Sequence, residues 1–359
     1  LKMPTARSHA RPPSSRSAGA TSLAAAAALL VVLGCPGALR CTGFAAAAAP
    51  AREMKSVKQI MGKPRRHWVG DGFHVYPVFH DLAFSQELSP WLMFDYASPE
   101  EFPPSRSRRG VGQHGHRGFE TVTIAFQGEV EHGDNVGNKD VIGPGDVQWM
   151  TAGSGIIHEE YHSTNFAKTG GLFEMCQLWL NLPAKHKMTK PIYQPILHGQ
   201  IPAVPLPPVG MSTTECAALA DSGSGAVVKV IAGEFNGVRG PAATFSPVEL
   251  WDVELGDLAD AAYELKIPEG HNCVVFVRRG RALIGAEGKE KPVEAQGVAL
   301  MHREGSTFRV VAAEPGTQLL ILGGEPLNEP IAAGGPFVMN TKEELAQAQA
   351  DYRSGRLTR

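Results

Sequence analysis

Short runs of apolar residues, many of them rich in Val, Ile and Phe, recur along most of the chain and are separated by turns that contain Gly or Pro. Such runs, bounded by turn residues, are typical of β-strands, whereas a helix requires a longer pattern with a period of 3.6 residues. Long helical patterns are scarce in this sequence. The pattern therefore predicts an all-β body.

Two sets of predicted strands follow each other at similar intervals, which suggests two β-domains of the same type. The runs of the first set are 67–78, 92–96, 119–126, 147–150 and 171–182. Those of the second set are 227–231, 261–267, 273–277, 281–284, 308–311 and 318–322. Between the sets, residues 183–208 are rich in proline and poor in periodicity, as linkers often are. We expect a first domain at 53–185, a linker at 186–215 and a second domain at 216–359.

Residues 1–52 have a different composition from the rest of the chain. They contain six Lys or Arg and no Asp or Glu, and the apolar run Leu23–Leu33 is too short to span a membrane comfortably. We predict a targeting leader, which would be a secretory signal, an organellar transit peptide, or a signal followed by a transit segment. Gly43-Phe44-Ala45 favours the last, for a plastid of algal type. A disordered Ala-rich tail without targeting function is the alternative, and no stable membrane anchor is expected.

The charge of the body argues against direct binding to nucleic acid. Removing the six positive charges of residues 1–52 from the formal net charge of −2 leaves −8 for the remainder, which has no basic stripe. Beyond the leader the cysteines Cys176, Cys216 and Cys273 lie far apart in the sequence. We expect them to be reduced, and Cys176 to belong to the core.

Two pairs of potential metal ligands carry the candidate chemistry: His114-Gly-His116 and His158-Glu-Glu160. Residues i and i+2 of a β-strand point to the same face, so each pair would direct both side chains into one space. Imidazole and carboxylate without thiolate suit Fe(II), Mn, Ni, Cu or Zn better than Ca or Mg. A centre of this kind with open coordination positions performs Lewis-acid or oxygen chemistry.

Other candidate residues carry weaker signals. Glu120 shares strand parity with His114 and His116 and is an alternative carboxylate, while Phe119 and Trp149 are possible cavity residues. A lone histidine in a β-protein is more often a hydrogen-bonded core or surface group than a ligand. Five histidines are left out for this reason: His132, His162, His186, His198 and His302.

Several motifs, in this order, resemble the pirin family of the cupin superfamily, over roughly residues 60–355. They are His114-Gly-His116-Arg-Gly-Phe-Glu-Thr-Val-Thr123, Gly145-Asp-Val-Gln-Trp-Met-Thr-Ala-Gly153, Gly155-Ile-Ile-His158-Glu-Glu160, Gln177-Leu-Trp-Leu-Asn-Leu-Pro183 and Gly334-Gly-Pro-Phe-Val-Met-Asn-Thr341. The resemblance implies two antiparallel cupin barrels of the jelly-roll type. A short C-terminal helix is expected from about Lys342 to Arg353, because Thr341-Lys-Glu-Glu344 forms a capping box.

The resemblance further implies an iron-type metal in the first barrel, with Fe(2+) preferred over Mn, Ni, Cu or Zn. The implied ligands are His114, His116, His158 and Glu160. Glu160 is preferred over Glu120, which would then orient an imidazole from behind, and it doubles as the catalytic proton acceptor. The second barrel retains only His271 at the corresponding place and is expected to lack a metal.

Two functions are compatible with the resemblance. The first is a quercetin 2,3-dioxygenase-like oxygenase, with O2 and a small phenolic such as a flavonol as substrates. The alternative is an iron-dependent coregulator or redox-sensing module that binds a protein partner without turnover. The sequence departs from the family pattern at Gly115, where proline is frequent, and at Ser154, where a basic residue is common. Neither departure affects a ligand.

Overall fold

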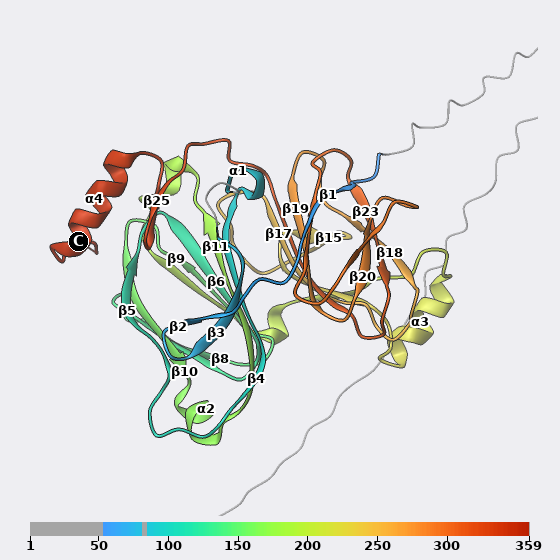
Figure 1. The fold of residues 1–359 in the computed structure, drawn as a ribbon, viewed down its shortest axis with the longest axis horizontal. Helices are drawn as coiled ribbons and strands as arrows, with labels where there is room; N and C mark the ends of the chain where they lie inside the picture. The colour runs from blue at the N-terminus through green and yellow to red at the C-terminus, as the bar shows by residue number, and fades with distance from the viewer. Residues whose placement is uncertain (1–52, 81–84, 359) are drawn as a thin grey trace, which may run out of the picture. The chain divides into compact units, whose positions relative to one another are not determined.

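The computed structural model describes residues 53–80 and 85–358, and the predicted leader lies outside these ranges. The described chain is built almost entirely from antiparallel strands, which confirms the predicted all-β class (Figure 1). It forms two domains, and each contains one seven-stranded sheet and one four-stranded sheet. None of the described helices is long and apolar enough to cross a membrane.

The first domain positions the candidate ligands on its smaller sheet. The seven-stranded sheet has the order β12 (Ile192–Ile196), β9 (Val147–Thr151), β6 (Phe119–Gln127), β11 (Gly171–Asn181), β4 (Trp91–Phe102), β3 (Phe73–Phe79) and β2 (His67–Val69). The four-stranded sheet has the order β5 (Gly110–His116), β10 (Ile156–His162), β7 (Val130–Asp134) and β8 (Lys139–Ile142). Buried side chains from both sheets, among them Val75 and Val130, pack together in one cluster, so the sheets face each other.

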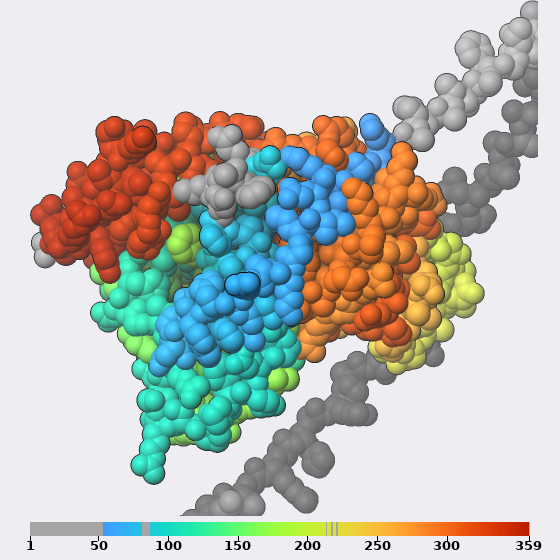
Figure 2. All heavy atoms as spheres, viewed as in Figure 1, coloured from blue at the N-terminus to red at the C-terminus, as the bar shows by residue number. Residues whose placement is uncertain are grey.

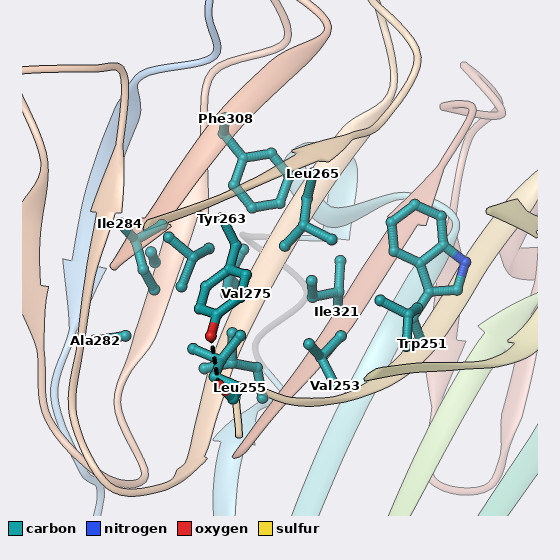
Figure 3. Close-up of a cluster of buried hydrophobic side chains, with 14 of the residues drawn as sticks. Trp251, Val253, Leu255, Tyr263, Leu265, Val275, Ala282, Ile284, Phe308 and Ile321 are labelled. Carbon is teal, nitrogen blue, oxygen red and sulfur yellow. Dashed lines mark hydrogen bonds between the residues drawn. The ribbon is translucent and has the colours of Figure 1, made fainter. Parts of the chain in front are cut away.

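The second domain repeats this arrangement. Its larger sheet has the order β1 (Val57–Met61), β22 (Val298–Met301), β19 (Asn272–Arg279), β24 (Gln318–Gly324), β17 (Val248–Glu254), β14 (Val227–Ala232) and β13 (Ala203–Pro205). Its smaller sheet has the order β18 (Ala262–Lys266), β23 (Thr307–Ala312), β20 (Ala282–Gly285) and β21 (Lys291–Val293). Figure 3 shows the apolar core between them, where the buried Tyr263 hydroxyl donates to the Leu255 carbonyl at 2.7 Å.

The remaining elements are short. They are α1 (Ser85–Leu88), α2 (Thr164–Thr169), α3 (Thr213–Asp221), α4 (Lys342–Arg353), the 3-10 turns Ala184–His186 and His198–Gln200, and the pairs β15 (Glu234–Phe235) with β16 (Val238–Arg239) and β25 (Ala332–Gly334) with β26 (Phe337–Met339). Helix α4 has the predicted bounds, and its capping box at Thr341 and Glu344 is formed. Cys176, Cys216 and Cys273 are free thiols, and Cys176 is buried.

A segment from each end of the described chain packs on the other domain. Strand β1, which the sequence places in the first domain, pairs with β22 of the second, and the blue strand lies against the orange part of the ribbon in Figure 1. The predicted linker also contributes edge strands, because β12 pairs with β9 and β13 pairs with β14. At the other end, residues 330–358, here called the C-terminal tail, pack on the first domain (Figure 2). Residues 57–61 and 330–358 thus each pack on the other domain, and the expected domain bounds stay a prediction.

A shared core joins the two larger sheets. Phe276 of β19 contacts Phe94 and Tyr96 of β4, with ring centroids 4.8 and 5.0 Å apart. At the edge of this contact Glu174 of β11 receives hydrogen bonds from Tyr96 at 2.7 Å and from Arg278 at 2.8 Å. The domains are thus joined by apolar packing and by a buried ion pair.

Candidate metal centre

Three imidazoles lie together at the end of the β5–β10 pair. In the register of this pair, His158 is opposite His114 and Ile156 is opposite His116. The ring centroids of His114 and His158 are 4.3 Å apart, and His116 lies 4.7 Å from the first and 4.9 Å from the second. One ring nitrogen of each histidine lies within 4.8 Å of the others. Strand pairing therefore brings together three of the four predicted ligands.

The hydrogen bonds of these rings leave nitrogen lone pairs for a metal. Nδ1 of His114 is 2.9 Å from the Gly112 carbonyl, and Nδ1 of His116 is 3.3 Å from the Pro336 carbonyl. A carbonyl oxygen only accepts, so Nδ1 carries the proton in both rings and Nε2 carries the lone pair. His158 is buried and neither of its ring nitrogens has a hydrogen-bond partner. A buried imidazole without partners is costly, and a cation bound among the three rings would satisfy it.

The protonation of the rings also fits metal binding, which requires neutral imidazole. Burial, assisted by the neighbouring His114, lowers the pKa of His116 to about 3. Burial likewise lowers the pKa of His158 well below its ordinary value, and the nearby histidines act in the same direction. Both rings are therefore neutral at physiological pH.

Glu160 lies near this group but has its own partners. Its Oε1 accepts from the Thr123 hydroxyl at 3.2 Å and from the Gln148 amide at 3.1 Å. A second set of potential ligands joins Glu160 with His158 and His132 within 4.8 Å, so His158 belongs to both sets. The β5–β10 register shifts between His158 and Glu160, which alters the simple alternation of faces. The full set of four ligands stays a prediction.

The alternative carboxylate, Glu120, lies on β6 and belongs to neither set of potential ligands found among the described residues. It accepts a hydrogen bond from Thr151 at 2.7 Å, and burial raises its pKa to about 7. It lies on the opposite sheet from His114, His116 and His158, so its position sets it apart from Glu160.

His132 was left out on sequence grounds, and the structure places it beside the centre. It lies on β7 of the β7–β8 hairpin, and across the pair of β7 with β10 it is opposite Glu160. Its Nε2 lies 3.1 Å from Asp134, its ring stacks on Tyr193, and its buried Nδ1 has no partner. His132 and Asp134 are two residues apart on one strand, and this spacing is the sequence signal that could have found His132.

The C-terminal tail completes the surroundings of the imidazoles. The Pro336 carbonyl of the tail accepts the hydrogen bond from Nδ1 of His116, and the buried Arg117 also binds the tail. The Arg117 guanidinium donates to Asp351 at 2.8 Å and to the Leu357 carbonyl at 3.0 Å. A Cβ on Gly115 would lie 2.6 Å from the Leu357 side chain. The glycine at 115 therefore allows the tail to pack tightly beside the candidate ligands.

A cavity of about 250 Å³ opens beside the imidazoles, between the two sheets of the first domain. Its walls are mostly apolar, and its lining residues are Val69, Phe73, Val75, Met93, Asp95, Val111, His114, His116, Glu160, Met175, Gln177, Trp179 and Pro336. Phe119 and Trp149 are fully buried and do not line it. Trp179, whose ring lies 4.3 Å from that of Phe119, supplies the aromatic wall instead.

Family models place both domains. The first matches the model "Pirin" over residues 72–180, and the second matches "Pirin C-terminal cupin domain" over residues 250–358. The chain belongs to the pirin family. Its fold is accordingly that of two cupin domains, as the sequence motifs indicated.

Relatives of this pirin carry two kinds of name. It is 49% identical over 306 residues to a putative quercetin 2,3-dioxygenase of Pseudomonas aeruginosa, covering 85% of this chain and 99% of the relative. It is 33% identical to Pirin of Homo sapiens, covering 76% of this chain and 83% of the relative. A crystal structure of quercetin 2,3-dioxygenase from Acinetobacter baumannii has a TM-score of 0.77 at 45% identity, covering 85% of this chain and 99% of that one.

Proposed function

We propose that this chain is a metal-dependent oxygenase that acts on a flavonol or a related phenolic, with Fe(II) as its metal. The observation that carries the proposal is His158, a buried imidazole without hydrogen-bond partners beside two further imidazoles and a mostly apolar cavity. The names of the bacterial relatives support a phenolic substrate.

Different residues of the site would bind the metal, accept a proton and exclude water. His114, His116 and His158 would hold the metal together with Glu160, whose carboxylate also lines the cavity. When bound, the metal supplies Lewis-acid activation of the substrate oxygen and a site for reaction with O2. Glu160 accepts hydrogen bonds from Thr123 and Gln148, so its carboxylate is oriented to take the proton of the substrate hydroxyl. The apolar walls would exclude water and hold a planar ring.

Replacement of one imidazole tests the proposal. His116→Ala should abolish both metal content and O2 consumption across a panel of flavonols and catechols. His302→Ala is the matched control, because the His302 side chain is 46% exposed and lies in the second domain. Wild-type turnover in the His116 variant would overturn the ligand assignment.

The same assay separates the oxygenase from a binding module. Wild-type protein that retains its iron but consumes no O2 with any phenolic in the panel would favour the redox-dependent, partner-binding function.

A further inference from the structure

Asp95 is a charged residue on the wall of the cavity that faces the candidate ligands. It lies on β4 of the seven-stranded sheet, whereas the imidazoles and Glu160 lie on β5 and β10 of the four-stranded sheet. Its partner across the β4–β11 pair is Gln177, and both side chains line the cavity. The cavity thus has a second polar group, on the sheet opposite the metal donors.

The Asp95 carboxyl has no hydrogen-bond partner among the residues that the structure describes. Burial raises its pKa to about 6, against the opposing charge of His80. Its neighbours in the cavity wall on the same sheet are Met93, Met175 and Trp179, and none of them donates a hydrogen bond to the carboxyl group. A half-buried carboxyl without a partner lowers stability, so a hydrogen-bonding ligand at this wall of the cavity would be favoured.

Gln177 is satisfied at one end only. Its Oε1 lies 2.8 Å from Oγ1 of Thr123, the same hydroxyl that lies 3.2 Å from Oε1 of Glu160, and the other end of its amide has no partner among the described residues. A carboxyl group beside the free end of an amide suits a hydroxyl, which both donates and accepts hydrogen bonds. An acidic phenolic hydroxyl suits it well, since hydrogen bonds that involve a carboxylate are the stronger ones.

We propose that Asp95 and Gln177 bind a hydroxyl group of the substrate on the side of the cavity opposite the metal donors. The preferred substrate is then a phenolic with at least two oxygen functions, one at the metal and one at Asp95 and Gln177. This inference rests on the proposed function, because it deepens the choice of substrate for the same cavity. It assigns Asp95 to specificity and leaves proton transfer to Glu160.

The test compares two flavonols that differ only in the hydroxyls of the pendant phenyl ring. Equilibrium binding is measured without O2, on the full chain loaded with Fe(II). We expect wild-type protein to bind the hydroxylated flavonol at least about tenfold more tightly, as a hydrogen bond to a charged group would give. Asp95→Ala should reduce this preference to near unity and leave the affinity for the unsubstituted flavonol almost unchanged.

Two further variants protect this test against misfolding. Asp95→Asn keeps the size of the side chain and should show an intermediate preference. Glu101→Gln, on the same strand but exposed, is the matched control and should keep the full preference. Only a specificity role changes the ratio of the two affinities, whereas a general loss of stability would weaken both.

The outcomes distinguish the two proposals. Equal binding of both flavonols by wild-type protein, or an unchanged preference in Asp95→Ala, would overturn the role of Asp95 and leave the oxygenase in place. Wild-type protein that holds iron but binds neither flavonol would refute the proposed function, and the inference with it.

Discussion

Glu174 is the residue whose replacement should weaken the contact between the two domains most. Its side chain is fully buried on β11 and accepts hydrogen bonds from Tyr96 of its own domain. It also accepts hydrogen bonds from two arginines on β19 of the second domain, from Arg278 at 2.8 Å and from Arg279. We expect Glu174→Gln to destabilise the protein strongly, because an amide presents N–H groups to donors that require an acceptor.

The magnitude follows from what remains around Arg278, whose side chain is only 5% exposed. Removing one partner of a buried ion pair costs about 3–5 kcal/mol, because the other charge stays buried. Arg278 keeps Asp252 at 3.3 Å and the Phe126 ring at 4.0 Å from its centroid. We therefore expect the lower end, about 3 kcal/mol at pH 7. Arg279, 39% exposed, adds little.

Urea unfolding followed by tryptophan fluorescence measures this loss. The matched control is Glu294→Gln, since Glu294 pairs with Arg281 at the surface, with side chains 74% and 45% exposed, and should cost under about 0.5 kcal/mol. A loss below about 1 kcal/mol for Glu174→Gln would refute the reasoning.

The difference in unfolding free energy between wild type and Glu174→Gln should also depend on pH. Burial acts to raise the pKa of Glu174, but Arg278 and the hydrogen bonds outweigh it and hold the pKa below its ordinary value. A carboxyl with a lowered pKa contributes stability above its unfolded pKa and loses it as the pH falls through its folded pKa. The difference between wild type and Glu174→Gln should therefore narrow in acid, and a constant difference would contradict the charge argument.

Two further predictions concern the surroundings of the candidate metal centre. The pKa of Glu120 is raised to about 7, so the folded protein holds a proton that the unfolded chain releases from about pH 4.5, and wild-type stability falls as the pH rises through this window. Glu120→Gln should remove this fall and gain stability relative to wild type at pH 8 in the same unfolding assay; parallel pH profiles would count against it. Arg117→Met should free the C-terminal tail and with it the Pro336 carbonyl that orients His116, so chelator competition should show a metal affinity at least about tenfold lower. An unchanged affinity would show that the tail does not support the ligands.

Alternation along single strands predicted much of the fold. The run 119–126 became β6, and the capping box placed α4 at both ends, because these features are local. Strand β17 was missed although it is almost fully buried, since Glu249 and Asp252 interrupt its apolar run. Their partners, His271 and Arg278, come from other parts of the second domain, so only the tertiary structure explains their burial.

In the candidate site, too, local spacing predicted some residues and missed those that only tertiary contacts bring together. The spacing of His114 and His116 placed them on one face, and the pairing of β5 with β10 added His158. His132 was missed because its hairpin has a polar composition, and the role of the tail was missed because Pro336 lies 220 residues beyond His116. Contacts over such separations leave no periodic signal in either segment.

The choice between the two carboxylates shows why parity alone cannot settle a ligand set. The alternation of faces along a strand does not distinguish the two carboxylates. Glu120 is four residues after His116 and Glu160 is two residues after His158, so each has the parity of a histidine. The register shift in β10 and the order of the sheets separate them. Glu160 reaches the cavity and is held by two donors, whereas Glu120 is buried on the opposite sheet against Thr151. A ligand must reach the metal, and of the two, Glu160 alone lines the cavity beside the candidate imidazole ligands.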